Sequence, residues 1–573
     1  MQLSKNSNLS TVRVGASQER SSLIRRLPAI RALRGAVALA LVAATVSGGA
    51  ADAAPATKPG HGSVDAVVRS AAAQQPGGTI QVIIQHRATG TSQSAVQRAG
   101  GQVKGGLKLG NALVAQVPAS AVDQIAADPS VARISFDAPV RSTANPQSEK
   151  STGLDAWRLQ TAYPEILQAA PMWGSNPPLL GTGVGVAVLD SGIKDHPDFG
   201  TSCDSRISTS RIVRQTAIAT DANGGPGDDN GHGTFVAGVI AGRGCGDWST
   251  RDDSNYIGVA PGANIISVKV SDRYGVSHTS DLIKGIEWVV ANKDTYNIRV
   301  MNLSLASTVA ESYRTSLIDA AVELAALKGI LVVAAAGNGG PNAIGYAPAN
   351  DPFVIAVGAT DDHGTQSTAD DSLASFSSYG TTVDGLNRPD LVAPGRHIVA
   401  PLASIRAPLA VQYPDHVLDN GFYIRLSGTS MAAPMVSGIA AQLLQAYPNL
   451  NADGVKWLLM HTARPLGFAG TGAGYPSTMA ANGYSHKAFF EGGSPIGHAF
   501  AGLTLNNYVA MAAYALQNGV SLSSVAWDSV AWDSVAWDSV AWDSVAWDSV
   551  AWDSVAWDSV AWDSVAWDSV AGN

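Results

Sequence analysis

The sequence predicts an α/β fold in which helices cover both faces of a mostly parallel sheet, preceded by a small α+β unit. Apolar runs of strand length recur between residues 184 and 358, and segments with helical spacing separate them. This alternation is typical of parallel sheets that are buried on both faces. A chain of 573 residues is too long for one ordinary core, so two to four folded units are expected.

The main domain is predicted over residues 150–518. Between its candidate strands, residues 281–291 have the apolar spacing of a helix. Active sites of such sheets gather beyond the carboxyl ends of the strands. Asp190 follows the first candidate strand and Asn338 lies just past another, so both are candidates for chemistry. The candidate strands are residues 184–189, 265–270, 300–303, 331–335 and 354–358.

A smaller unit is predicted over residues 54–149. Alternating and apolar runs indicate three strands, and short segments between them have helical spacing. Strands and helices in this order suit a compact α+β sandwich. The strands are expected at residues 80–85, 112–117 and 131–136, and the helices at 91–99 and 119–127.

Residues 1–53 are predicted to be a signal peptide. Four arginines precede an apolar run over residues 36–46, and Ala51-Asp52-Ala53 offers small residues for cleavage. The run is shorter than the roughly 20 apolar residues that a membrane-spanning helix needs. We therefore expect no transmembrane span, and a protein secreted to the medium or the cell surface. A start codon assigned too far upstream would also explain the long basic region.

The tail, residues 519–573, contains nine tandem copies of Ser-Val-Ala-Trp-Asp over residues 524–568. A period of five matches neither a strand nor a helix. Three interpretations stay open: a solvated low-complexity tail, a small solenoid that stacks its tryptophans, and a sticky segment that contacts cell-wall polymer or another chain. Removing the nine aspartates of the repeat from 46 acidic residues leaves 37, against 37 basic residues. Nothing therefore indicates a nucleic-acid partner.

Three short motifs supply a carboxylate, an imidazole and a hydroxyl. They are Val-Leu-Asp190-Ser-Gly, Asn-Gly-His232-Gly-Thr and Gly428-Thr-Ser430-Met-Ala-Ala-Pro. Acyl transfer needs these groups as a nucleophile, its base and the residue that orients the base. Ser430 would begin a helix, where unpaired N–H groups and the helix dipole favour negative charge. Each residue alone has a plain structural interpretation as a turn, loop or capping residue.

Asn338, in Ala-Ala-Gly337-Asn338-Gly, is the candidate second donor to the oxyanion of such a reaction. A side-chain amide aimed at the tetrahedral oxygen stabilises it strongly. An asparagine beside glycines is also a common turn residue.

In these motifs the chain resembles the subtilisin-like serine proteases, or subtilases. Asp190-Ser-Gly-Ile, His232-Gly-Thr-Phe-Val-Ala-Gly and the Ser430 motif match the three active-site blocks of that family, and Ala336-Gly337-Asn338 matches its oxyanion block. The resemblance covers about residues 150–518 and implies a subtilisin-like sheet and a peptide substrate that pairs as an added strand. It implies cleft walls formed by Leu305, Ala306, Ser307, Ala336 and Gly337.

The 54–149 unit resembles the inhibitory propeptide of the same family, which is a ferredoxin-like domain. An unrelated small α+β domain stays open. The resemblance also raises a structural calcium site, because Asp198 matches a frequent calcium ligand and Asp247 and Asp252 lie in the region of a family calcium loop. Solvated loop acids are the alternative.

The two cysteines, Cys203 and Cys245, flank the segment that carries His232. An exported protein meets an oxidising environment, so we expect one disulfide between them. Two free thiols are the alternative.

Together these features predict an exported zymogen that cleaves itself near residues 141–152 and then hydrolyses polypeptides without an organic cofactor. Its own propeptide is the expected intramolecular inhibitor. Two other classes stay open. One is a catalytically silent fold that acts by binding, with the Trp repeat as its adhesive part, and the other is an acyl transferase or ligase on the same triad.

Overall fold

The computed structural model describes six stretches of the chain, all within one compact unit, Thr57–Asn573. The predicted signal peptide and the repeat tail lie outside the described residues. The six stretches are residues 62–87, 92–144, 162–219, 225–246, 256–418 and 421–509.

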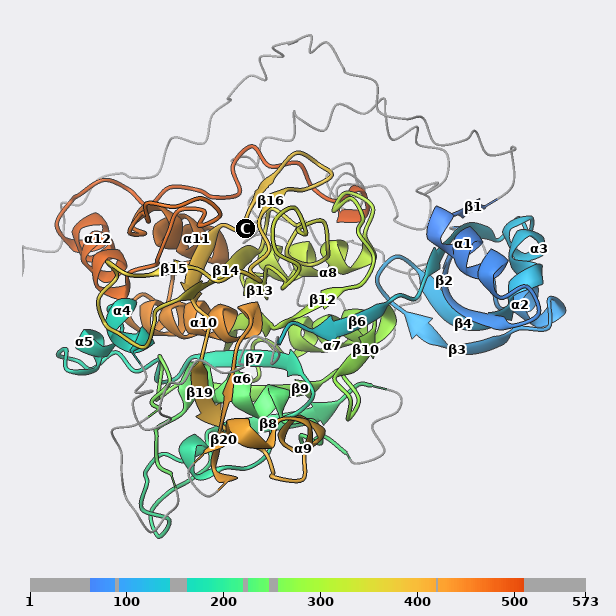
Figure 1. The fold of residues 1–573 in the computed structure, drawn as a ribbon. Coiled ribbons are helices and arrows are strands. Elements are labelled where there is room, and N and C mark those ends of the chain that lie inside the picture. Colours follow the sequence, from blue (N-terminus) through green and yellow to red (C-terminus); the bar gives the residue numbers. More distant parts are fainter. Residues whose placement is uncertain are drawn as a thin grey trace, which may run out of the picture. The chain divides into compact units, whose positions relative to one another are not determined.

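The N-terminal part forms a five-stranded sheet in the order β1-β5-β2-β4-β3 with three helices (Figure 1). From β2 to β5 the elements run βαββαβ, which is the ferredoxin-like order. The three expected strands and two expected helical segments form, and β1, α1 and β3 are additional. The elements are β1 Ser63–Val64, α1 Ala66–Gln74, β2 Thr79–His86, α2 Gln93–Arg98, β3 Gln102–Leu107, β4 Ala112–Pro118, η1 Ala119–Ala121, α3 Val122–Ala126 and β5 Val131–Phe136.

Side chains of this small sheet alternate between two cores. Val82 and Ile84 of β2 belong to the core under the sheet's own helices, whereas Ile83 between them belongs to the core of the main domain. Successive strand residues point to opposite faces, so each face meets a different partner. The small sheet is therefore buried on both faces, and one face packs on the main domain.

The main sheet has the order β15-β14-β13-β11-β7-β9-β8, and β18 pairs with β14. All of these pairs are parallel except the one between β14 and β15, as the continuous apolar runs predict. The strands are β7 Gly185–Asp190, β8 Ile212–Ala217, β9 Asn264–Lys269, β11 Ile298–Leu303, β13 Leu331–Ala335, β14 Ile355–Asp361, β15 Ser372–Leu373 and β18 Leu391–Pro394.

Helices cover both faces of this sheet (Figure 1). Helices α6 and α10 pack against each other on one face, and α7, α8 and α11 lie on the other. This confirms the α/β class. The bounds are α6 His232–Ala241, α7 Thr279–Asn292, α8 Leu317–Leu327, α10 Thr429–Ala446 and α11 Ala452–His461.

Shorter elements complete the domain. β6, from the end of the N-terminal part, lies between β10 and β12 in a three-stranded sheet. The segment 468–496 contains helix α12, capped by the Ser477 side chain. The remaining bounds are β6 Pro139–Ser142, α4 Tyr163–Ile166, α5 Ala170–Trp173, η4 Pro197–Phe199, β10 Val276–His278, β12 Leu305–Ser307, β16 Gly380–Thr381, β17 Asn387–Arg388, β19 Ile398–Pro401, α9 Pro408–Gln412, η5 Pro414–His416, β20 Val417–Leu418, β21 Tyr423–Leu426 and α12 Thr478–Phe490.

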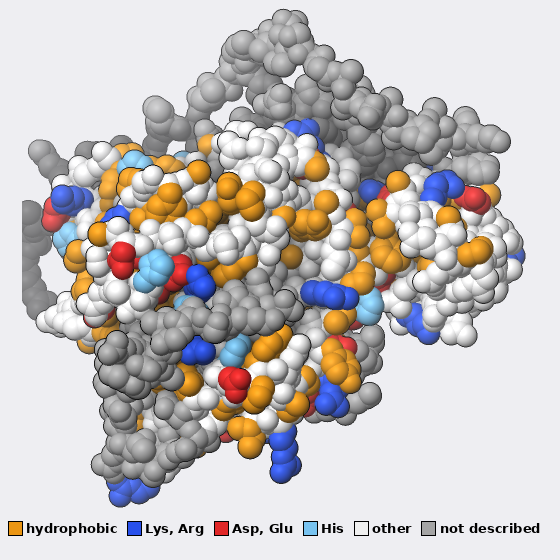
Figure 2. Space-filling model, viewed as in Figure 1, with side chains coloured by type: hydrophobic (Ala, Val, Ile, Leu, Met, Phe, Trp, Pro, Cys, Tyr) orange, Lys and Arg blue, Asp and Glu red, His pale blue; other side chains and the backbone are white. Residues whose placement is uncertain are grey.

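The surface matches the balanced charge of the sequence. On the face drawn in Figure 2, acidic and basic side chains are interspersed and neither forms a continuous patch. Among the described residues, no helix is both long and apolar enough to cross a membrane.

Candidate active site

The carboxylate and the imidazole meet at the carboxyl end of the main sheet. Asp190 is the last residue of the buried strand β7, and His232 is the first residue of α6. The Nδ1 atom of His232 lies 2.8 Å and 2.9 Å from the two carboxylate oxygens of Asp190. The backbone N–H of Ser191 also donates to this carboxylate, at 2.7 Å. The pair therefore has the geometry expected of a general base and the carboxylate that orients it.

A second buried carboxylate, Asp228, organises the loop before His232. Its oxygens accept hydrogen bonds from the N–H groups of Gly231 and Thr234 and from the hydroxyls of Ser191 and Thr234. Burial raises the pKa of Asp228 in spite of these donors. Sequence analysis missed this residue. The signal was an acidic residue shortly before the start of a helix, a position that favours capping.

The protonation of His232 follows from the balance of its surroundings. Burial lowers the pKa of the imidazole, but the charge of Asp190 and its hydrogen bond raise it by more, so the net shift is upward. The charge of Asp228 acts in the same direction. A raised pKa strengthens the imidazole as a base once the proton has left.

Ser430 is the second residue of α10, and the predicted helix from Ser430 is present. Its hydroxyl lies 2.6 Å from the Thr143 hydroxyl and donates to the Ser304 carbonyl at 2.9 Å. The Nε2 atom of His232 is buried and has no hydrogen-bond partner among the described residues. In the candidate triad, the hydrogen bond between Asp190 and His232 is thus formed, whereas none joins His232 to Ser430.

Asn338 lies beside the nucleophile, just past β13. Its side-chain oxygen accepts from the N–H of Thr429 at 2.9 Å and from the Thr429 hydroxyl at 3.1 Å. These bonds fix the amide so that its Nδ2 donates to the carbonyl oxygen of Thr143. The carbonyl of Thr143 therefore lies against the candidate oxyanion donor, and the side-chain hydroxyl of the same residue contacts the candidate nucleophile.

The chain's own residues 139–143 fill the cleft as an added strand. β6 pairs antiparallel with β10 on one side and with β12 on the other. The N–H of Thr143 continues the pairing by donating to Ser304 O at 3.2 Å. Leu305, Ala306 and Ser307, which form β12, thus lie on one side of this strand, and β10, which sequence analysis missed, lies on the other. Their role as substrate-binding walls stays a prediction.

Ala336 and Gly337 lie next to Asn338 at the same end of the sheet. Ala336 is buried and its N–H donates to Val357 O, while the N–H of Gly337 donates to the Thr429 hydroxyl at 3.1 Å. Their described hydrogen bonds therefore hold the loop that carries Asn338.

Glycine at position 428 lets the cleft strand approach closely. Gly428 has a φ of 149°. A Cβ there would lie 3.0 Å from the Cα of Ala144 and 3.1 Å from the Nδ2 of Asn338, and closer still to the carbonyl oxygen of Thr143. Any side chain would displace the Thr143–Ala144 peptide from the donors.

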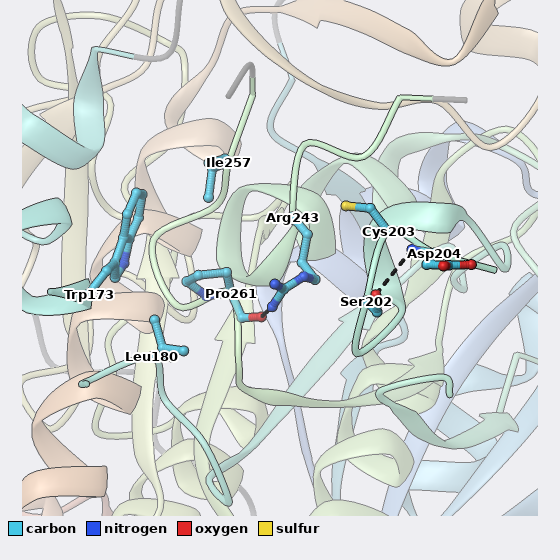
Figure 3. A pocket seen from close by; sticks show the side chains of 8 residues that line it. All are labelled: Trp173, Leu180, Ser202, Cys203, Asp204, Arg243, Ile257 and Pro261. Carbon is cyan, nitrogen blue, oxygen red and sulfur yellow. Dashed lines mark hydrogen bonds between the residues drawn. The ribbon is translucent and has the colours of Figure 1, made fainter. Parts of the chain in front are cut away.

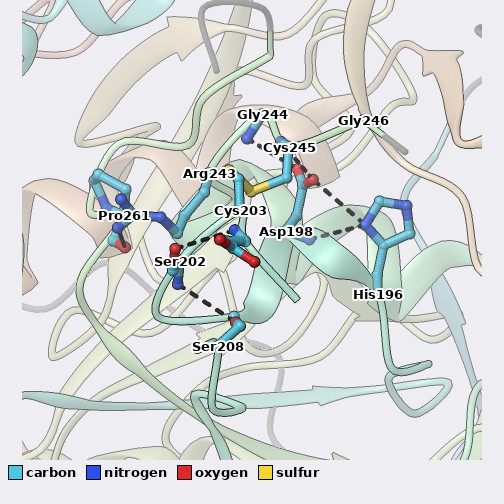
Figure 4. Close-up of a disulfide and its surroundings, with 12 residues drawn as sticks. His196, Asp198, Ser202, Cys203, Ser208, Arg243, Gly244, Cys245, Gly246 and Pro261 are labelled. Carbon is cyan, nitrogen blue, oxygen red and sulfur yellow. Dashed lines mark hydrogen bonds and ion pairs between the residues drawn. A yellow bond between two sulfur atoms is a disulfide. The ribbon is translucent and has the colours of Figure 1, made fainter. Parts of the chain in front are cut away.

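The two cysteines form a disulfide beside the η4 turn (Figure 4). The carboxylate of Asp198, in η4, accepts from the N–H groups of Gly244 and Cys245 and from the Tyr423 hydroxyl. These three donors hold the carboxylate in place, and a calcium ion at Asp198 stays a prediction. Asp247 and Asp252 lie outside the described residues, and calcium at their loop stays a prediction. No group of three or more acidic, His or Cys residues in the described stretches fits a metal.

A hollow of about 430 Å³ lies near the disulfide (Figure 3). Trp173 and Leu180 line one side, and Arg243 and Cys203 line the other. None of its lining residues belongs to the triad or to the cleft walls. The hollow is therefore separate from the candidate active site.

Comparison with known proteins agrees with this geometry. The family described as the subtilase family matches residues 181–488. Serine protease AprX of Bacillus subtilis is 40% identical over 292 residues, which are 49% of this chain and 61% of AprX. The thermostable alkaline protease of Halalkalibacterium halodurans is 34% identical over 289 residues, 64% of its length, and subtilisin Savinase of Lederbergia lenta is 35% identical over 86% of its length. The match spans less than two thirds of the first two relatives. The family match contains Asp190, His232, Asn338 and Ser430, and the chain belongs to the subtilase family of subtilisin-like serine proteases.

Proposed function

We propose that this protein is a secreted serine endopeptidase made as a self-processing zymogen, whose N-terminal unit is its propeptide. The observation that carries the proposal is the hydrogen bond from Asn338 Nδ2 to the carbonyl oxygen of Thr143, with the Ser430 hydroxyl alongside. Family membership supports the peptidase chemistry. The first bond cleaved would be Thr143–Ala144, within the predicted range 141–152.

In this mechanism the Ser430 oxygen attacks the Thr143 carbonyl carbon while His232 Nε2 takes the hydroxyl proton. The oxyanion is stabilised by Asn338 Nδ2 and by the Ser430 N–H, which lies at the start of α10 and has no partner within the helix. His232 then gives its proton to the amine of Ala144, and the C–N bond breaks. Water hydrolyses the acyl-enzyme with His232 again as base, and Asp190 orients the imidazole throughout. No organic cofactor is needed for these steps.

The same cleft would accept other polypeptides once the N-terminal unit leaves. An extended substrate would pair between β10 and β12, as residues 139–142 do, with main-chain hydrogen bonds on both sides. Because main-chain pairing is independent of sequence, this arrangement supports a broad range of peptide substrates.

The deciding experiment is the intact mass of the secreted protein, wild type beside Ser430→Ala. We expect the wild type to begin at Ala144 and the variant to keep the Thr143–Ala144 bond. Ser437→Ala, on the same helix, is the matched control, because its hydroxyl bonds Asn302 and not the cleft strand. Cleavage of the variant at the wild-type position would mean that another protease matures the chain. It would also favour the alternative in which the fold is catalytically silent and acts by binding.

The same masses test the remaining parts of the proposal. Loss of residues before 54 would support the signal peptide and export, and the mass of the C-terminal fragment would report whether the 519–573 repeat is kept. Binding of a repeat-deleted protein to cell-wall polymer, compared with the full chain, tests the adhesive role. Melting temperature with calcium and with a chelator tests a calcium site near Asp247 and Asp252.

A further inference from the structure

The last described residues of the chain reach back to the N-terminal unit. The hydroxyl of Tyr508 donates to the side-chain oxygen of Gln85 at 2.9 Å and accepts from Nη1 of Arg133 at 3.0 Å. Gln85 is in β2 and Arg133 is in β5 of the small sheet. A tyrosine hydroxyl has one donor hydrogen, and here both its donor and its acceptor capacity are used on the same unit.

The segment that carries Tyr508 is fixed firmly to the main domain. The N–H of the fully buried Asn506 donates to both carboxylate oxygens of Glu323 in α8, at 2.8 Å and 2.9 Å. Its side-chain amide donates to Tyr313 O and Ser316 O, and Asn507 N–H donates to Arg314 O. The Tyr508 hydroxyl is therefore presented from a rigid base at the start of α8.

Arg133 joins the two parts at the same point. Its Nε pairs with Asp65 of the N-terminal unit at 2.8 Å, and its Nη1 also donates to Thr315 O of the main domain at 3.4 Å. A cavity of about 260 Å³ beside Arg133 separates the surfaces there. Because close packing is missing at the cavity, the polar contacts around Arg133 carry the connection at this edge.

This contact lies outside the residues that the family model matches. The family match ends at residue 488, so Tyr508 follows it, and the Trp repeat begins soon afterwards at residue 524. Other attachments of the N-terminal unit, among them those through β6, through Asp137 at the start of α7 and through Leu109 to Glu287, lie on the matched domain. The Tyr508 contact is thus made C-terminal to the matched domain.

We infer that the segment Asn506–Tyr508 is a docking site for the N-terminal unit, and that it slows release of this unit after the chain is cleaved. The inference rests on the proposed function, in which the unit is a propeptide. It makes latency depend on the C-terminal end: trimming the chain before residue 506, or pulling on the repeat, speeds activation. The partner is the polar edge formed by Gln85, Arg133 and Asp65.

The test uses the full chain with Tyr508→Phe, which keeps the ring and removes both hydrogen bonds. Tyr447→Phe is the matched control, because that hydroxyl donates to Asn482 O within the main domain. Intact mass first shows whether each protein has cleaved itself. The rate at which the processed N-terminal fragment leaves the enzyme is then followed on dilution, as the rise of activity on a peptide substrate. We expect Tyr508→Phe to release the fragment at least about tenfold faster, the lower end of the range for a hydrogen bond to a charged group.

A double-variant cycle with Arg133→Met locates the effect. If the two side chains act together, the double variant releases the fragment more slowly than the product of the single effects predicts. If the N-terminal fragment leaves the Tyr508→Phe variant at a rate within twofold of that from the Tyr447→Phe variant, the inference is overturned.

The measurement also separates this inference from the proposed function. If the wild type does not cleave itself, the zymogen proposal fails, and the contact is then tested in the uncleaved Ser430→Ala chain. There Tyr508→Phe should raise amide hydrogen exchange in β2 and β5 relative to Tyr447→Phe. Unchanged exchange would overturn the docking site independently of any cleavage.

Discussion

Replacing Gly428 by alanine separates the cost of backbone strain from the cost of blocking the cleft. Gly428 has a positive φ of 149°, and its Cβ would meet the Thr143–Ala144 peptide and the Asn338 amide. Gly183 is the matched control, because its φ of 82° is also positive but a Cβ there meets nothing within 4 Å. Both alanine variants carry a strained backbone, and Gly428→Ala alone displaces the bound peptide.

The expected magnitudes follow from these two terms. A non-glycine residue held in a sparsely populated region of positive φ costs about 1 to 3 kcal/mol, so both variants should lose stability in that range. A Cβ 3.0 Å from the Ala144 Cα lies inside ordinary contact distance, and relief requires a shift of the bound chain by several tenths of an ångström or more. Misplacement of a reacting group by about 1 Å costs on the order of 10²-fold in rate.

The assay combines urea denaturation of each variant with a time course of self-cleavage by mass. Gly183→Ala should cleave itself at close to the wild-type rate despite its lower stability. Gly428→Ala should be slower by on the order of 10²-fold, and its kcat/KM on an added peptide should fall similarly. Equal cleavage rates for the two variants would refute the assigned position of the cleft strand.

Three further predictions concern titration and the resting triad. Asp190→Asn should lower kcat by on the order of 10⁴, as in the trypsin triad, and move the acid limb of kcat/KM to lower pH, because Asp190 raises the pKa of His232. Burial raises the pKa of Asp351 to about 7. The protonated carboxyl therefore contributes its whole stabilisation of the fold below its ordinary pKa, and this contribution is lost as the pH rises through about 7. Asp351→Asn should therefore gain stability over the wild type from pH 4 to pH 8 in urea titrations, and a constant difference would contradict this. Thr143→Val removes the hydroxyl that holds Ser430, so self-cleavage should speed up by about two- to tenfold, whereas slower cleavage would mean that this contact assists attack.

The pattern of apolar residues predicted those strands of the fold whose side chains are all buried in an apolar environment. β13 forms at its predicted residues, and β7 and β9 are displaced by one residue, because strands buried on both faces are apolar throughout. β3 was not predicted, since its sequence Gln-Val-Lys-Gly-Gly-Leu has weak strand propensity and is held by pairing with β4 at the sheet edge. Tertiary pairing, which the local sequence does not encode, decides such a strand.

The candidate site likewise contains residues that local motifs predict and contacts that depend on the tertiary structure. Asp190, His232, Asn338 and Ser430 stand at element ends, where parallel strands and helix starts bring side chains together, and their motifs predicted this placement. Asp228 acts through a loop whose path positions its two oxygens against five donors. The contacts of Thr143 join residues 195 and 287 positions apart in the sequence, and no local pattern reports them.

Register, more than the side chain of Thr143, should decide which bond is cleaved. The Asp137 carboxylate accepts from the N–H and the hydroxyl of Ser280 at the start of α7, and β6 begins two residues later. From this anchor the strand pairing delivers the carbonyl of residue 143 to Asn338. One extra alanine after Ala138 should therefore move the cleaved bond to Ser142–Thr143, which intact mass detects as a retained threonine. A slip by one residue turns every side chain of the strand to the other face, so slower cleavage is expected as well. Cleavage that stays after Thr143 would show that the site selects the side chain and that the strand bulges to accommodate the insertion.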